Sequence, residues 1–344
     1  MEKRPQMDRI RRMLTISERV VPWLALVATP LGLFLVLRSQ GEAIASLESI
    51  GWDAIVPSAL AFMLAPLLQG VSFWVVLRLL TQQTPFLDTM VVWSRSYLVR
   101  YAPTGALSVA YRLSARRRLR ASADQVLAAF AYEHVSVLLA AAAACLVLFF
   151  LAGDLPPLLP LAIALAALVL AAALQPRIAG RGVEAAARRL GLHLTVILEG
   201  RQLAIVVAMN ILGWLGTGGA VYLLVTTVTG SSPPFLWLVG SYTAGYLVGF
   251  VAPLAPGGLG VREAMLVVLL APRYGMGVAI AISLAIRLAN VAGELLAVAL
   301  VHVVYVAHTA STPVRQITAE VEGTRVRTRW MINGMPRAPI HRPN

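Results

Sequence analysis

A glycine turn followed by an arginine is the strongest candidate for a binding site in this chain. Gly257, Gly258 and Gly260 precede the apolar run 261–270, and Arg262 lies in the first turn of the helix predicted there. Glycines leave the backbone N–H groups of a helix N-terminus accessible, and the helix dipole favours a negative charge at that end. Arginine can engage two oxygens of one phosphate. The pattern predicts an anion site, although a tightly packed turn with Arg262 reaching the membrane interface fits the same residues.

The composition indicates that this site lies inside a membrane. Of 344 residues 58% are hydrophobic and only 13% are charged, and the mean hydropathy is +0.76. Soluble domains carry roughly a quarter charged residues. We therefore predict about six full helical spans, each long enough to cross a hydrocarbon core of about 30 Å, at residues 20–37, 54–80, 125–151, 155–174, 203–228 and 277–308.

The positions of the arginines predict the orientation of these spans. Basic residues gather at the N-terminus, at 112–120, at 177–201 and after residue 308, which places all four segments in the cytoplasm. The chain then divides into a basic cytoplasmic N-terminus (1–19), a transmembrane domain (20–308) and a basic cytoplasmic tail (309–344). We expect the plasma membrane to be its location. In the tail, alternating residues around Glu322 and Gly323 predict a small hairpin.

Two further apolar segments, 88–112 and 235–271, are interrupted by proline and glycine and cannot be continuous helices. If either crossed the membrane, an arginine-rich segment would lie outside the cell. Both are therefore predicted to be re-entrant, the first from the cytoplasm and the second from the outside.

The two broken segments also share a sequence pattern. Each has Tyr-Leu-Val, starting at Tyr97 and Tyr246, then an aromatic residue, a Pro/Gly break and an arginine, Arg112 or Arg262. The tripeptide alone could arise by chance. Together with the opposite entry sides it predicts an inverted repeat, an arrangement that places a transporter's binding site near the membrane midplane. The predicted fold class is an all-α polytopic membrane protein with two re-entrant broken helices in an inverted repeat.

Ionisable residues inside the spans add to the candidate site. Glu133, Arg287 and Glu294 lie within apolar helices, where charges are costly unless they face the bundle interior. Structural ion pairing, for instance of Glu133 with Arg287, is the competing interpretation. We expect the headgroup of a lipid to meet Arg100, Arg112, Gly257, Gly258, Gly260, Arg262 and Arg287, and we expect charge balancing or gating from Glu133, Glu263 and Glu294.

Several classes of function are disfavoured. The single cysteine, Cys145, allows neither an intrachain disulfide nor a thiolate metal cluster, and we expect no metal or cofactor. No Gly-Lys-Ser/Thr phosphate loop is present, since the only lysine is Lys3. A formal charge of +13 could suggest nucleic acid as a partner. However, these charges lie between apolar runs and in the tails, as topogenic charges do, so we expect no nucleic-acid binding.

The stretch 252–270, APLAPGGLGVREAMLVVLL, together with Arg287, resembles the lysylphosphatidylglycerol synthase transmembrane-region family of flippase-like membrane proteins. The segments YLVRYAPTGAL (97–107) and AFAYEHVSVLL (129–139) resemble its first half, so the resemblance covers about 20–308. Two departures are Glu133-His134, where the family tends to have Glu-Arg, and Ala-Pro-Thr-Gly in place of Leu-Pro-Gly. The resemblance implies a domain that moves or presents an anionic or aminoacylated lipid across the bilayer.

We therefore expect a lipid translocase that binds an anionic phospholipid or a lipid-linked sugar, and we do not expect an enzyme. The resemblance implies that multidomain relatives carry a soluble aminoacyl-transferase domain after the membrane part, whereas about 36 residues follow His308 here. The alternatives are a non-catalytic scaffold for cell-envelope lipid synthesis and a glycosyltransferase that uses polyprenyl-phosphate sugars, with a base among Glu42, Glu48 and Asp53. Besides lipid, the expected partners are a second copy of the chain or a separate lipid-modifying enzyme.

Overall fold

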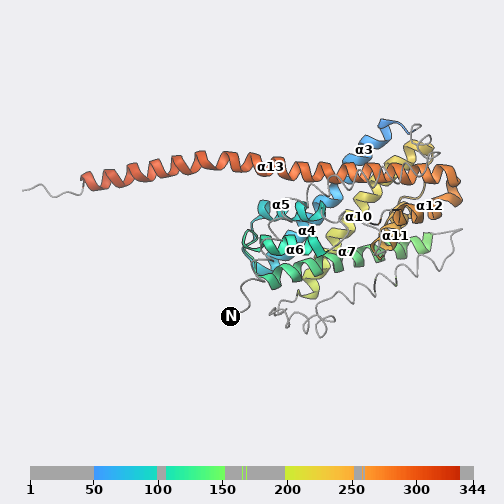
Figure 1. Ribbon diagram of the computed structural model, residues 1–344, viewed down its shortest axis with the longest axis horizontal. Coiled ribbons are helices and arrows are strands. Elements are labelled where there is room, and N and C mark those ends of the chain that lie inside the picture. Colours follow the sequence, from blue (N-terminus) through green and yellow to red (C-terminus); the bar gives the residue numbers. More distant parts are fainter. Residues whose placement is uncertain are drawn as a thin grey trace, which may run out of the picture. The chain divides into compact units, whose positions relative to one another are not determined.

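The computed structural model describes residues 50–98, 106–151, 165, 168, 198–251, 258 and 260–333, and every regular element within these ranges is a helix (Figure 1). This confirms the predicted all-α class for the described residues. The elements are α3 (Trp52–Phe62), α4 (Leu64–Thr81), α5 (Phe86–Leu98), α6 (Ala106–Ser114), the 3₁₀ turn η2 (Ala115–Arg117), α7 (Ala123–Leu151), α10 (Gly200–Thr229), α11 (Phe235–Val251), α12 (Val261–Tyr274) and α13 (Met276–Asn333).

Within the described ranges, four stretches are long and apolar enough to cross a membrane: Trp52–Thr81, Ala123–Val147, Gly200–Thr229 and Met276–Ala310. They coincide with the predicted spans 54–80, 125–151, 203–228 and 277–308. The predicted spans 20–37 and 155–174 lie outside the described residues. The first stretch consists of α3 and α4, which are separated at Met63. Pro66 has no N–H to donate to the Phe62 carbonyl, which explains an interruption at this point.

Two parts of the chain follow the same order of elements. In the first, α5 and α6 flank the undescribed residues 99–105 and are followed by the long helix α7. In the second, α11 and α12 flank the undescribed residues 252–257 and are followed by α13. The register also matches, because Trp93 and Tyr242 are each the eighth residue of their helix. Side chains from α5 and α11 therefore have counterparts in the two parts.

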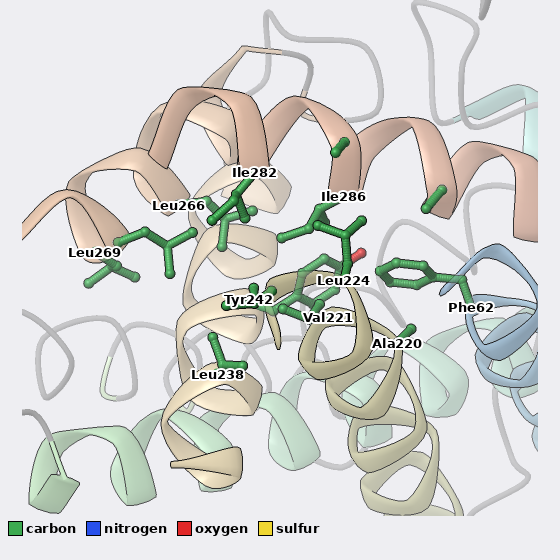
Figure 2. Close-up of a cluster of buried hydrophobic side chains, with 14 of the residues drawn as sticks. Phe62, Ala220, Val221, Leu224, Leu238, Tyr242, Leu266, Leu269, Ile282 and Ile286 are labelled. Carbon is green, nitrogen blue, oxygen red and sulfur yellow. The ribbon is translucent and has the colours of Figure 1, made fainter. Parts of the chain in front are cut away.

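The chain forms two compact units, 1–301 and 302–344. A large hydrophobic core in the first unit joins α3 to α10, α11, α12 and α13, and Figure 2 shows side chains from these helices meeting, Phe62, Leu224, Tyr242, Leu266 and Ile286 among them. Burial of these apolar side chains fixes the helices that carry the candidate site.

A close approach between α13 and α3 fixes the position of α13 on this core. A Cβ atom at Gly293 would lie 2.6 Å from the Ala59 carbonyl oxygen and 2.7 Å from the Phe62 Cβ. Only glycine allows the backbones to come this near. The contact sets the position of Glu294, the next residue of α13.

The second unit contains the C-terminal part of α13, which remains helical to Asn333. The hairpin predicted around Glu322 and Gly323 is therefore wrong. A helix satisfies its backbone hydrogen bonds within its own segment, whereas an isolated hairpin is marginally stable. One glycine lowers helix stability by only about 1 kcal/mol, so Gly323 does not end the helix.

Candidate functional site

A polar cavity in the first unit is lined by α4, α5, α7, α10, α11, α12 and α13. It has room for about 60 Å³ of water-sized molecules. A single water needs roughly 10–15 Å³ measured in this way, so the space holds several waters or part of a small headgroup. Its charged side chains are Arg262 and Glu294, its amide and hydroxyl groups are Gln69, Asn210, Thr217 and Asn290, and its aromatic rings are Tyr97, Trp214, Tyr242 and Tyr246.

Arg262 is the positive charge of this cavity and is only 7% exposed. The carbon at the centre of its guanidinium lies 5.2 Å from the ring centres of both Tyr242 and Tyr246, as in cation–π contacts. Two glycines make room for its side chain. A Cβ at Gly249 would lie 2.4 Å from the Arg262 Cγ, and Gly258, with a φ of +72°, lies against the same stem.

A chain of hydrogen bonds connects Arg262 to Glu294. The guanidinium Nη2 donates to the Tyr242 hydroxyl at 2.6 Å, and this hydroxyl donates to the Asn290 Oδ1 at 3.0 Å. The Asn290 Nδ2 then donates to the Glu294 Oε1 at 2.7 Å. Since all four residues are buried, the positions of the two opposite charges depend on each other.

Glu263 occupies the N-terminus of α12. Its Oε2 accepts a hydrogen bond from the Gly260 N–H at 2.6 Å, and its Oε1 lies 3.5 Å from the Arg287 Nε. The Gly260 N–H, which the sequence suggested as a donor to a headgroup, is thus used by a carboxylate of the same chain. Arg287 lies beside a second, small cavity of about 10 Å³ that Arg262 and Tyr242 also line.

Arg112 and Glu133 form a buried ion pair between α6 and α7. The Arg112 Nε donates to the Ser96 Oγ at 2.7 Å, and Glu133 also accepts from the Trp93 Nε1 at 2.8 Å. The guanidinium lies over the Phe73 ring at 4.3 Å. Glu133 therefore pairs with Arg112 and not with Arg287, the partner given from the sequence as an example of the competing interpretation, structural ion pairing.

The structure brings together one part of the set predicted from the sequence. Arg262 and Glu294 line the polar cavity, and Glu263 and Arg287 line the small cavity beside it. Arg112 and Glu133 do not line the polar cavity. Arg100 and Gly257 lie outside the described residues.

Sequence reasoning missed the neutral polar residues of the cavity. Asn210, Gly213 and Thr217 recur at helical spacing on α10, and Asn290 stands one turn before Glu294 on α13. An amide side chain inside an apolar span indicates that water or a ligand can reach the interior of the helix bundle, because the amide needs hydrogen-bond partners there. Over the described residues, no three histidine, cysteine or acidic side chains are grouped as metal ligands would be.

An apolar groove adjoins the polar cavity. It measures about 200 Å³ and is lined by alanines and other apolar residues of α7, α10 and α11, with Ala140, Ala144, Leu215 and Val239 among them. Trp214 lines both spaces, and its Nε1 donates to the Val137 carbonyl at 3.4 Å. One indole thus separates a polar compartment from an apolar one.

The sequence was also compared with known proteins and families. No curated protein matches the chain closely enough to count as a relative. The profile of one family matches residues 22–298, which is most of the chain and contains both ion pairs and the cavity. The protein is a multi-pass membrane protein and belongs to the family described as the lysylphosphatidylglycerol synthase TM region.

Proposed function

We propose that the protein is a lipid translocase. In this proposal the anionic headgroup of a phospholipid or lipid-linked sugar binds at Arg262, while the hydrocarbon chains stay among the apolar helices. The observation that carries the proposal is a buried arginine that lines a polar cavity between helices apolar enough to span a membrane. Polar groups at such positions mark substrate pathways in membrane proteins.

The setting of Arg262 suits a phosphate. Charges attract more strongly in a low-dielectric interior than in water. Two tyrosine rings and one tyrosine hydroxyl hold the guanidinium in place, so little side-chain entropy is lost on binding. A fixed guanidinium can offer parallel N–H donors to two phosphate oxygens.

The apolar groove favours a lipid over a soluble anion. Because Trp214 lines the groove and the polar cavity alike, a molecule with a charged head and a hydrocarbon chain can occupy both. The groove runs along α7 from Ala140 to Val147, which is roughly 10 Å at a rise of about 1.5 Å per residue. A free phosphate would leave this groove unused.

The charges around the cavity suggest how binding drives movement. Arg262 and Arg287 are balanced by Glu263 and Glu294, so a phosphate brings an excess negative charge. In this proposal the excess negative charge in the cavity is relieved when a carboxylate moves away from its arginine or takes up a proton. Such an exchange of partners would alternate the side from which the cavity is open.

The proposed architecture has about six full spans and two re-entrant broken helices in an inverted repeat. Support comes from the shared order of elements in α5–α7 and α11–α13 and from the equivalent places of Trp93 and Tyr242. We place both termini in the cytoplasm and the protein in the plasma membrane, because of the arginine-rich segments. Translocation makes and breaks no covalent bond, so the proposal assigns no catalytic residue. The proposed protein partners are a second copy of the chain, as a homo-oligomer, or a separate lipid-modifying enzyme.

Lipid scrambling in proteoliposomes tests the proposal. Headgroup-labelled anionic and zwitterionic lipids are exposed to a membrane-impermeant quencher, and wild type is compared with Arg262→Ala and Arg287→Ala. We expect protein-dependent quenching of inner-leaflet lipid that Arg262→Ala slows at least tenfold. Quenching no faster than in protein-free vesicles for every lipid would overturn the proposal and favour a scaffold.

A further inference from the structure

We infer that Gln69 and Thr217 recognise a hydroxyl group of the headgroup bound at Arg262. The preferred lipid then carries polyol hydroxyls, from glycerol or from a sugar, next to its phosphate. This inference rests on the proposed function and extends it from the charge of the headgroup to its chemical class.

Thr217 is the buried group that points to a ligand. It lines the polar cavity and is 3% exposed. Across the part of the chain that the structure describes, its hydroxyl has no hydrogen-bond partner, in contrast to Thr226 and Thr227 on the same helix, which donate to carbonyls of the preceding turn. The hydroxyl oxygen is not among the fully buried polar atoms that lack a partner, so it is accessible from the cavity, where a bound molecule can form a hydrogen bond with it.

Gln69, on α4, brings a second neutral group to the same cavity. Its side chain is half-buried, and its amide has no hydrogen-bond partner among the described residues. The nearby Asn210 differs, because the two N–H groups of its Nδ2 are already used, with Ser72, Ser136 and the Val206 carbonyl all within hydrogen-bond distance. Gln69 and Thr217 are thus two cavity side chains of α4 and α10 that can both donate and accept hydrogen bonds with a ligand.

Space for that ligand exists beside Thr217. Gly213 lies one turn before Thr217 on α10 and lines the cavity, and a Cβ built at Gly213 would meet no atom within 4 Å. Asn210, Gly213 and Thr217 follow one another at spacings of three and four residues, which places them on one face of α10. The charged residues of the cavity come instead from α12 and α13.

The chemistry of the two groups selects a hydroxyl. An amide and a hydroxyl can each donate and accept hydrogen bonds, and a ligand hydroxyl does the same. Phosphate oxygens only accept hydrogen bonds, and an ammonium only donates them. Neither therefore uses both the donors and the acceptors of Gln69 and Thr217. A site built to bind a hydroxyl rejects an analogue that lacks it, because its own polar groups then remain unpaired.

The test compares lipids that differ only in headgroup hydroxyls. Acyl-labelled phosphatidylglycerol and phosphatidylpropanol have the same phosphate charge, but the second lacks the glycerol hydroxyls. Phosphatidylinositol, with a ring polyol, separates a sugar-like headgroup from glycerol. Translocation of each lipid is measured for wild type, Thr217→Val, Gln69→Leu and the matched control Thr227→Val, whose hydroxyl lies outside the cavity and donates to the Leu223 carbonyl at 2.8 Å.

We expect wild type and Thr227→Val to move one of the polyol lipids about tenfold faster than phosphatidylpropanol, since one hydrogen bond is worth about that factor. Thr217→Val and Gln69→Leu should remove this preference, so that the polyol lipids and phosphatidylpropanol move at similar rates. Equal wild-type rates for all three lipids would overturn the inference and would mean that water is the hydrogen-bond partner of Thr217. The proposed translocase activity would still stand. No translocation of any lipid would overturn both.

Discussion

The Tyr242 hydroxyl accepts a hydrogen bond from the Arg262 guanidinium at 2.6 Å and donates one to Asn290 at 3.0 Å. It is thus the link between the arginine of the cavity and the carboxylate of Glu294, which Asn290 reaches at 2.7 Å. The aromatic ring has separate contacts, since it packs against Phe62 with ring centres 5.8 Å apart. The link and the packing can therefore be separated by a single substitution.

Tyr242→Phe removes the hydroxyl and keeps the ring. We expect translocation to fall about tenfold because Arg262 loses its link to Glu294, and we expect stability to fall by about 1–3 kcal/mol because a buried donor of Arg262 and a buried acceptor of Asn290 lose their partner. Initial rates in proteoliposomes and thermal midpoints in detergent measure the two effects. Tyr222→Phe, on α10 and outside the cavity, is the control; equal rates for the two variants would refute a role for the hydroxyl.

Gly249→Ala tests whether the stem of Arg262 must pass close to α11. The added Cβ would lie 2.4 Å from the Arg262 Cγ, so the guanidinium must move. We expect at least a tenfold loss of translocation with a folded protein, as judged by size-exclusion chromatography. Gly216→Ala on α10 is the matched change, because a Cβ there meets no atom within 4 Å. A wild-type rate for Gly249→Ala would show that the position of Arg262 is not critical.

The Arg112–Glu133 pair is expected to support the fold and not the passage of lipid. Arg112→Met should destabilise the protein by about 3–5 kcal/mol, because Glu133 is left as an unpaired buried charge. Adding Glu133→Leu should recover part of this loss, with Trp93 still lacking its acceptor. The thermal midpoint is measured first, and translocation is then compared at equal folded fraction. A double variant that is stable but inactive would place Arg112 in the lipid pathway after all.

Cysteine labelling tests whether the two broken segments are re-entrant, as proposed. The native Cys145 is buried and should give little background. We expect Gln83→Cys and Arg117→Cys to react from the cytoplasmic side, and Ser232→Cys and Met276→Cys to react from the outside, because each pair flanks a segment that we propose enters and leaves the membrane at one face. A pair whose members react from opposite sides would mean that its segment crosses the membrane.

The sequence predicts the helical class, the four described spans and the burial of Arg262 and Glu294 between helices, because apolar run length and charges within apolar runs are properties of local sequence. It does not predict the pairing of charges. Glu133 could have paired with any arginine of another helix, and its pairing with Arg112 depends on how α6 packs against α7.

Gln69 and Thr217 were missed for a similar reason, since the rotation of each helix decides which side chains face a cavity. The capping of Gly260 by Glu263 could have been predicted, because a glutamate three residues into a helix commonly reaches back to its N-terminus.

Direct lipid binding measures the central claim that Arg262 holds the headgroup phosphate. Native mass spectrometry of the purified protein, titrated with phosphatidylglycerol, would compare wild type with Arg262→Gln and with Arg78→Gln. Arg78 is an exposed arginine of α4 that lies over the Trp74 ring, outside the cavity. We predict that wild type and Arg78→Gln retain one bound lipid and that Arg262→Gln loses it. Equal lipid retention by all three proteins would contradict the assignment of the headgroup site to Arg262.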